Sequence, residues 1–171
     1  MKMYQVDAFT NELFKGNPAA VIIRDTWLDE QLMQSIAAEN NLAETAFVKI
    51  IDAENYEIRW FSPTVEVDFC GHATLASSFV LFKDYTQASK IQFHVKKFGI
   101  FTIIKEDDGK IQMDFPIRQP EPVEHYPEIL KEVIDKPIKE IYLNDQAYIL
   151  VCENETDVIH ATPNFAIINA I

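Results

Sequence analysis

The sequence contains little glycine and little cysteine. Its 171 residues include 4 glycines and 2 cysteines, Cys70 and Cys152. With so few glycines and no internal repeat, collagen-like and solenoid chains are excluded. The two cysteines are too few and too far apart for a disulfide framework or a Cys-based metal site. We therefore expect a reducing, cytoplasmic compartment.

Basic residues and long apolar runs are also scarce. The chain has 15 Lys and Arg against 27 Asp and Glu, a formal net charge of −12, and no basic cluster denser than Lys96-Lys97. Because binding to phosphates needs clustered cations, nucleic acid is not an expected partner. No run approaches the roughly 20 apolar residues of a membrane span, so no membrane partner is expected. The acidic Asp7 also comes too early for a signal peptide.

The apolar content is high enough for a folded core, since 48% of the residues are hydrophobic. Charge and proline divide the chain. Residues 119–171 hold 3 of the 15 basic but 10 of the 27 acidic residues, and the prolines 116, 120, 122 and 127 cluster at the change. This pattern predicts a complete first lobe over residues 1–117, a Pro-rich linker over 118–127 and a partial second lobe over 128–171.

One predicted helix is unusual because it is apolar or small on every face. It covers residues 73–82, and short strands are predicted on both sides of it in the sequence. A helix of this kind must be surrounded by protein. The pattern therefore predicts an α+β fold in which a curved, mostly antiparallel sheet wraps around a central buried helix.

A second predicted helix covers an outer position over residues 29–40. The spacing of Thr26 and Asp29 is that of a capping box at its start. The apolar residues expected on its buried face recur at steps of one to four: Leu28, Leu32, Ile36 and Ala37.

The strongest candidate for chemistry is the junction that precedes the central helix. Amide N–H groups at a helix start lack intrahelical partners, and the helix dipole favours negative charge there. The amides of Gly71, His72 and Ala73 could therefore hold a carboxylate or a developing enolate. The alternative is an ordinary helix start, in which Gly71 is needed for its backbone angles and His72 only caps the helix.

Two further side chains are candidates. Glu44 begins an apolar strand, and a desolvated carboxylate suits general acid/base work near neutral pH; the alternative is a solvated carboxylate at a strand end. Cys70 could be a proton-transferring thiol activated by the helix start or a small core residue. No metal-ligand cluster or phosphate loop occurs in the sequence, so we expect no metal and no nucleotide.

Three motifs, in order along the chain, resemble one known family. The first runs from Gln5 to Val21 and includes the sequence KGNPAAV; the second is ENNLAETAFV over residues 39–48. The third comprises RWFSP over residues 59–63 and EVDFCGHATLA over residues 66–76. In these motifs the chain is similar to the PhzF-like isomerases, the phenazine-biosynthesis group within the diaminopimelate epimerase-like superfamily.

The resemblance implies a fold and a chemistry. The family fold has two pseudo-symmetric lobes, each a sheet around a central helix, with the active site in the cleft between them. By motif position, Glu44 corresponds to the glutamate that moves a proton between carbons of a small carboxylic acid. The resemblance places Asn17, Gly71, His72 and Ala73 at the substrate, without a cofactor, and implies a homodimer. Cys70 matches the first catalytic cysteine of diaminopimelate epimerase and becomes an accessory candidate.

The resemblance also has a gap. The family's second lobe supplies an acidic residue and a Gly-Ser or Gly-Thr helix start, and no such motif occurs in these 171 residues. The expectation is a piece of a longer chain or a shortened homologue. Two alternatives to a Glu-based isomerase follow: a noncatalytic fold or assembly module, and a thiol-based amino-acid racemase or epimerase.

Overall fold

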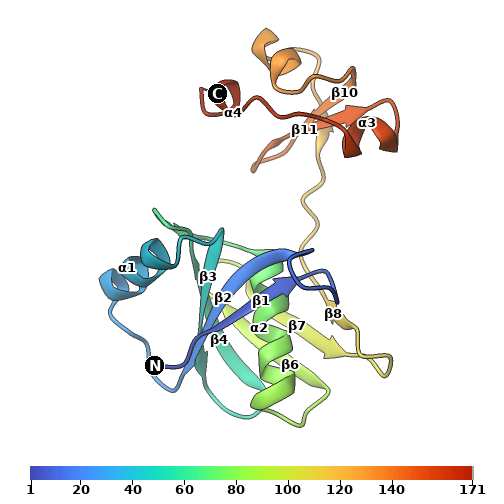
Figure 1. The fold of residues 1–171 in the computed structure, drawn as a ribbon. Coiled ribbons are helices and arrows are strands. Elements are labelled where there is room, and N and C mark those ends of the chain that lie inside the picture. Colours follow the sequence, from blue (N-terminus) through green and yellow to red (C-terminus); the bar gives the residue numbers. More distant parts are fainter. Residues whose placement is uncertain (171) are drawn as a thin grey trace. The chain divides into compact units, whose positions relative to one another are not determined.

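The structure, a computed structural model, describes residues 1–170 and divides into two compact units, Met1–Phe115 and Pro116–Ile171. Unit 1 contains an 8-stranded sheet and two helices (Figure 1). Its helices are α1 (Glu30–Asn40) and α2 (Gly71–Asp84). Its strands are β1 (Tyr4–Ala8), β2 (Asn17–Arg24), β3 (Glu44–Ile50), β4 (Asn55–Phe61), β5 (Glu66–Val67), β6 (Lys90–Val95), β7 (Gly99–Lys105) and β8 (Ile111–Met113).

The sheet of unit 1 is mixed and curls around α2 (Figure 1). The strand order is β1-β2-β3-β4-β6-β7-β8, with β5 paired to β4. Five of its seven strand pairings are antiparallel, and only β2 with β3 and β4 with β6 are parallel. The predicted α+β fold, a curved and mostly antiparallel sheet around one central helix, is confirmed.

Both faces of the central strands are buried because the two helices cover opposite faces. Side chains alternate along a strand, so neighbouring residues enter different cores. In β3, Ala46 belongs to the core around α2 and Phe47 to the core around α1. In β4, Trp60 and Phe61 are divided in the same way.

Helix α2 is buried over most of its surface, as its composition predicts. Its small polar residues are satisfied within the helix, since the Ser77 and Ser78 hydroxyls donate to the carbonyl oxygens four residues earlier. The helix is longer at both ends than the predicted 73–82. Phe79 is 47% exposed, so one face of α2 lies outside the curve of the sheet, which corrects the expectation of complete enclosure.

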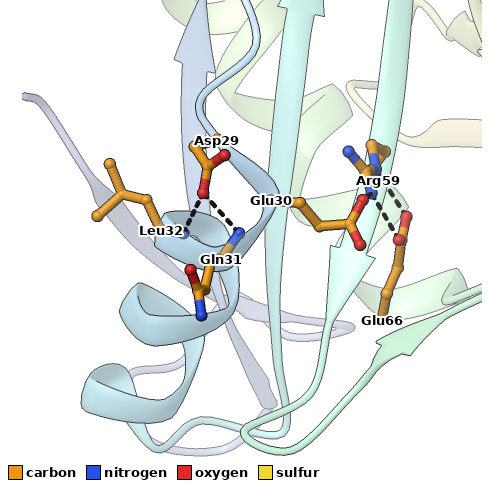
Figure 2. A network of polar contacts seen from close by, with 6 residues as sticks. All are labelled: Asp29, Glu30, Gln31, Leu32, Arg59 and Glu66. Atoms are coloured by element: carbon orange, nitrogen blue, oxygen red, sulfur yellow. Dashed lines mark hydrogen bonds and ion pairs between the residues drawn. The ribbon is translucent and has the colours of Figure 1, made fainter.

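Helix α1 starts and packs differently from the prediction. Asp29, not Thr26, is the N-cap: its Oδ1 accepts from the amides of Gln31 and Leu32 at 2.9 and 3.3 Å (Figure 2). Met33 and Ala37 are the buried residues of the helix, whereas Leu32 is 48% exposed. The predicted cap and the predicted place of Leu32 are therefore wrong.

Unit 2 is a small three-stranded sheet with short helices around the buried residues Leu130, Val133 and Ile141. Its elements are β9 (Glu121–Pro122), η1 (Glu128–Glu132), β10 (Ile138–Leu143), β11 (Tyr148–Cys152), α3 (Glu155–Ile159) and α4 (Phe165–Ile168). The segment predicted as a linker contains β9, which pairs with β10. The last helix of the unit is α4, and Ile171 lies outside the described residues. None of the helices within residues 1–170 has the length and apolarity to cross a bilayer.

Candidate functional site

Glu44 is the first residue of β3, where the sheet meets the end of α1. In the parallel pairing of β2 and β3, Ala19 lies opposite Glu44. Asn17 precedes Ala19 by two residues on β2, so it lies about 7 Å further along at the same end of the sheet. The strand register therefore brings these two predicted site residues to the same end of two neighbouring strands.

The end of α1 holds the start of β3. Asn41 ends the helix in the left-handed conformation, with φ of 49° and its amide donating to the carbonyl of Ala37. The Asn40 side-chain amide donates to the Thr45 hydroxyl at 3.1 Å, next to Glu44. Asn40 is not among the site residues predicted from the sequence. The signal available was the Asn-Asn pair, since asparagine tolerates the left-handed conformation and bonds locally.

The start of α2 is open. Cys70 is the extended N-cap residue and makes no side-chain capping bond, and no acidic residue occurs in the first turn. The amides of Gly71, His72 and Ala73 precede the first intrahelical bond, which runs from the Thr74 amide to the Cys70 carbonyl at 3.1 Å. No acidic side chain of α2 therefore compensates the partial positive charge of this end, although the Cys70 sulfur lies beside the amides of His72 and Ala73.

Gly71 is not required by the fold around it. Its φ is not positive, in contrast to Gly99 and Gly109, and a Cβ built on it would meet only the Phe69 ring, at an ordinary 3.9 Å. The alternative that Gly71 serves its own backbone angles is therefore wrong. Its lack of a side chain leaves room for at least a methyl group beside the first amides of α2.

Three side chains from this region converge. His72 Nε2 lies 3.3 Å from Glu44 Oε2, with side-chain exposures of 10% and 21%. On the other side of the same ring, His72 Nδ1 lies 3.3 Å from Cys70 Sγ. The structure thus joins β3 and the start of α2 through residues that are 28 positions apart in the sequence.

The imidazole nitrogen that faces Glu44 is not satisfied. Among the described residues, His72 Nε2 and Trp60 Nε1 are the buried side-chain nitrogens without a hydrogen-bond partner. The 3.3 Å approach of Glu44 is close enough for attraction, but the N–H does not point straight at the carboxylate. A buried polar nitrogen without a partner is costly. Such an atom in a cluster of this kind is suited to a ligand, and catalytic hydrogen bonds often tighten only when the ligand binds.

Cys70 belongs to this cluster as a neutral thiol. Burial raises the pKa of the Cys70 thiol to about 12, and the nearby Glu44 carboxylate acts in the same direction, although the Ala73 and His72 amides oppose the shift. The donor atoms of Glu44, Cys70 and His72 lie within 4.8 Å of one another, a spacing that a metal ion could bridge. In this structure the three groups contact one another instead: His72 Nδ1 lies at Cys70 Sγ and His72 Nε2 at Glu44 Oε2.

Arg59 lies in one of the motif segments but is engaged elsewhere. Its guanidinium pairs with Glu66 at 2.6 Å and with Glu30 at 2.7 Å, as Figure 2 shows. These residues line a groove of about 790 Å³ together with Trp27 and the turn between β6 and β7. Because two carboxylates compensate the charge of Arg59, this cation is not available to an anionic ligand in the groove.

The cluster can move a proton next to an anion. Glu44 offers a carboxylate that is only 21% exposed, the start of α2 offers amide donors, and His72 offers a ring nitrogen beside both. A carboxylate base next to preorganised donors is the arrangement that proton abstraction beside a carboxylate or carbonyl group requires.

Comparisons with known proteins agree with the motifs. The chain matches the family model of phenazine biosynthesis-like proteins (PhzC-PhzF) over residues 6–170. It is 42% identical over 166 residues to an uncharacterized isomerase of Pseudomonas aeruginosa, covering 97% of this chain and 62% of that protein. It is also 42% identical over 174 residues to an uncharacterized isomerase of Halalkalibacterium halodurans, covering 99% of this chain and 63% of the relative.

A solved structure gives the same relationship. The crystal structure of a PhzF-family phenazine biosynthesis protein from Enterococcus faecalis superimposes with a TM-score of 0.86 and 40% sequence identity. The alignment covers 99% of this chain and 64% of that one. The chain therefore spans somewhat less than two thirds of the length of these relatives.

Proposed function

The chain belongs to the phenazine biosynthesis-like (PhzC-PhzF) family, and from that premise we propose that it is a cofactor-independent isomerase or epimerase in which Glu44 moves a carbon-bound proton of a small carboxylic acid. The relatives that match almost the whole chain carry the name isomerase. The observation that supports the proposal most directly is the 3.3 Å approach of Glu44 Oε2 to the unpartnered His72 Nε2 at the open start of α2.

The proposed reaction needs no partner other than the substrate. The Glu44 carboxylate takes a proton from a substrate carbon, and the electron pair of the broken C–H bond delocalises onto the substrate's carboxylate or unsaturated system. The protonated Glu44 then returns the proton to a carbon of the same molecule. Atoms and electrons balance without a redox cofactor, and one positioned acid/base typically contributes about 10²- to 10⁴-fold to such a step.

The substrate anion lies, in this proposal, against the start of α2. The amides of Gly71, His72 and Ala73 hold its carboxylate, and the space beside Gly71 admits it close to the backbone. The buried His72 Nε2, which has no hydrogen-bond partner, is proposed as a side-chain donor to the substrate. Asn17 lies at the same end of the sheet and is proposed as a further substrate contact.

A mechanism in which Cys70 is the base has less support. With a pKa of about 12, the thiol releases its proton only in strongly alkaline solution. A carboxylate is already ionised at neutral pH and needs no activation to accept a proton. We therefore assign the base role to Glu44. A homodimer in the cytoplasm, with both cysteines free, is the proposed state of the protein, and light scattering at micromolar concentration tests the dimer.

The test is exchange of carbon-bound hydrogen with solvent. The protein is incubated in D₂O with a panel of small amino, hydroxy and unsaturated carboxylic acids, and deuterium incorporation is followed by NMR and mass spectrometry. Glu44→Gln should lower the exchange rate at least about 100-fold while ligand binding persists. The matched control is Glu39→Gln, an exposed carboxylate on α1, which should exchange at the wild-type rate.

Two results would contradict the proposal. Exchange at the wild-type rate by Glu44→Gln removes Glu44 as the base. Binding of a panel acid by the wild-type protein, without exchange of any of its hydrogens, favours the noncatalytic module.

A further inference from the structure

Cys70 has no role in the proposed reaction, yet it contacts His72, whose Nε2 lies 3.3 Å from Glu44. Its sulfur lies 3.3 Å from His72 Nδ1, and the residue is 7% exposed. We infer that Cys70 is a positioning residue: its thiol donates to His72 Nδ1 and so fixes the ring as a neutral donor with its proton on Nε2. This inference rests on the proposed function, because Nε2 is the nitrogen that faces Glu44 and the ligand.

In the hydrogen bond between Cys70 and His72, the thiol is the donor. The thiol keeps its proton, since burial disfavours the thiolate. A neutral imidazole has one N–H and one acceptor nitrogen. The Glu44 carboxylate is also near the thiol, but the contact with hydrogen-bond geometry is the one to Nδ1 at 3.3 Å. The thiol is satisfied there when Nδ1 is the acceptor, and the ring proton is then on Nε2.

The contact on the other side of the ring disfavours the opposite neutral tautomer. Nε2 lies 3.3 Å from Glu44 Oε2. If the proton were on Nδ1, two acceptors, Nε2 and a carboxylate oxygen, would lie only 3.3 Å apart and repel each other. With the proton on Nε2 the contact is attractive. Cys70 and Glu44 therefore select the same tautomer from opposite sides.

The fixed tautomer gives His72 a defined chemical role. The ring does not compete with Glu44 for the substrate proton, because its only unprotonated nitrogen is occupied by the thiol. It offers the Nε2–H to the charge that develops on the substrate. The partner at one ring nitrogen commonly sets the orientation and proton position of the other, and here a cysteine supplies that partner.

The test reads the ring directly and needs no substrate. The side-chain ¹⁵N and ¹H correlations of His72 are recorded for the protein at about pH 8, at the upper end of the range in which imidazole ordinarily titrates. The expected wild-type result is a protonated Nε2 and an unprotonated Nδ1 whose shift shows an accepted hydrogen bond. In Cys70→Ala the Nδ1 signal should move to the position of a free acceptor or of a protonated nitrogen. In Cys70→Ser, which keeps a donor, the wild-type pattern should persist.

The matched control is Cys152→Ala, which removes the other free cysteine, on β11 of unit 2, and should leave the His72 signals unchanged. In the exchange assay Cys70→Ala should lower the rate roughly three- to ten-fold, the effect of one net hydrogen bond, with rescue by Cys70→Ser.

A wild-type His72 with its proton on Nδ1 would overturn the inference, and so would identical His72 signals in the wild type and Cys70→Ala. Either result can be obtained whether or not Glu44→Gln loses exchange, so failure of this inference is distinguishable from failure of the proposed function.

Discussion

Replacing Gly71 with alanine tests whether this glycine is needed for ligand binding or for the stability of the fold. A Cβ at Gly71 meets no atom closer than 3.9 Å, and the residue is the first of α2 with an ordinary φ. Alanine fits such a position and restricts the unfolded chain, so Gly71→Ala should stabilise the protein by about 0.4–1 kcal/mol and raise the unfolding midpoint by roughly 1–4 °C. The same methyl group fills the space beside the first amides of the helix. Exchange should fall by roughly 100-fold, the order of effect of losing one oxyanion donor.

Gly16→Ala is the control, because at Gly16 the fold itself requires a residue without a side chain. A Cβ at Gly16 would overlap the carbonyl oxygen of Ala8 and lie 2.7 Å from Thr10 Cγ2. Because a backbone atom cannot move aside cheaply, this variant should lose about 1–3 kcal/mol of stability in urea denaturation. Two results would refute the role of Gly71 in leaving room for a ligand. One is a loss of stability in Gly71→Ala like that of Gly16→Ala, and the other is exchange of substrate hydrogen by Gly71→Ala at the wild-type rate.

Two further predictions concern the cap of α1 and the cysteine of the cluster. Asp29→Ala should cost about 1 kcal/mol in urea denaturation because two amides lose their acceptor, whereas Thr26→Ala should change stability by less than about 0.5 kcal/mol; equal losses would return the cap to Thr26. Iodoacetamide should label Cys70 in the folded protein far more slowly than the half-buried Cys152 at neutral pH, with a rate that rises about ten-fold per pH unit up to the thiol's pKa of about 12. Mass spectrometry of the labelled peptides measures both rates, and rapid labelling of Cys70 would show an ionised thiol instead.

The central helix could be predicted from the sequence because its signal is local. A segment without a polar face has few possible environments, and the strands around it alternate with a period that periodicity detects. The start of α1 could not be predicted in the same way. The Trp27 indole donates to Glu57 Oε2 at 2.8 Å, across 30 residues, and this contact occupies the segment that a cap at Thr26 would place inside the helix. A long-range side-chain contact decided between two nearby caps.

The candidate site shows the same division between local and long-range signals. The open helix start at Gly71 and the strand start at Glu44 are visible in the sequence as separate features. Their meeting depends on the parallel register of β2 with β3 and on where the curl of the sheet places α2. The hydrogen bond between Cys70 and His72 joins residues only two positions apart in the sequence. Its proposed effect on the ring proton nevertheless depends on Glu44, which lies at the other ring nitrogen. Sequence spacing contains no information on that geometry.

In the proposed site, the groups that donate hydrogen bonds to the substrate are uncharged. The acidic composition of the chain is one reason, and the chemistry of the neighbouring base is another. The chain has 27 acidic against 15 basic residues, and Arg59, the cation of the nearest motif, is bound by Glu30 and Glu66. A lysine or arginine beside Glu44 would hold a substrate carboxylate strongly, but it would also stabilise the charged form of the neighbouring base and weaken it as a proton acceptor. In the proposed site, backbone amides and a neutral imidazole would bind the anion through directed dipoles and add no full charge next to the base. In the arrangement that we propose, the neutral thiol of Cys70 donates a hydrogen bond to His72 Nδ1 and so favours the neutral ring.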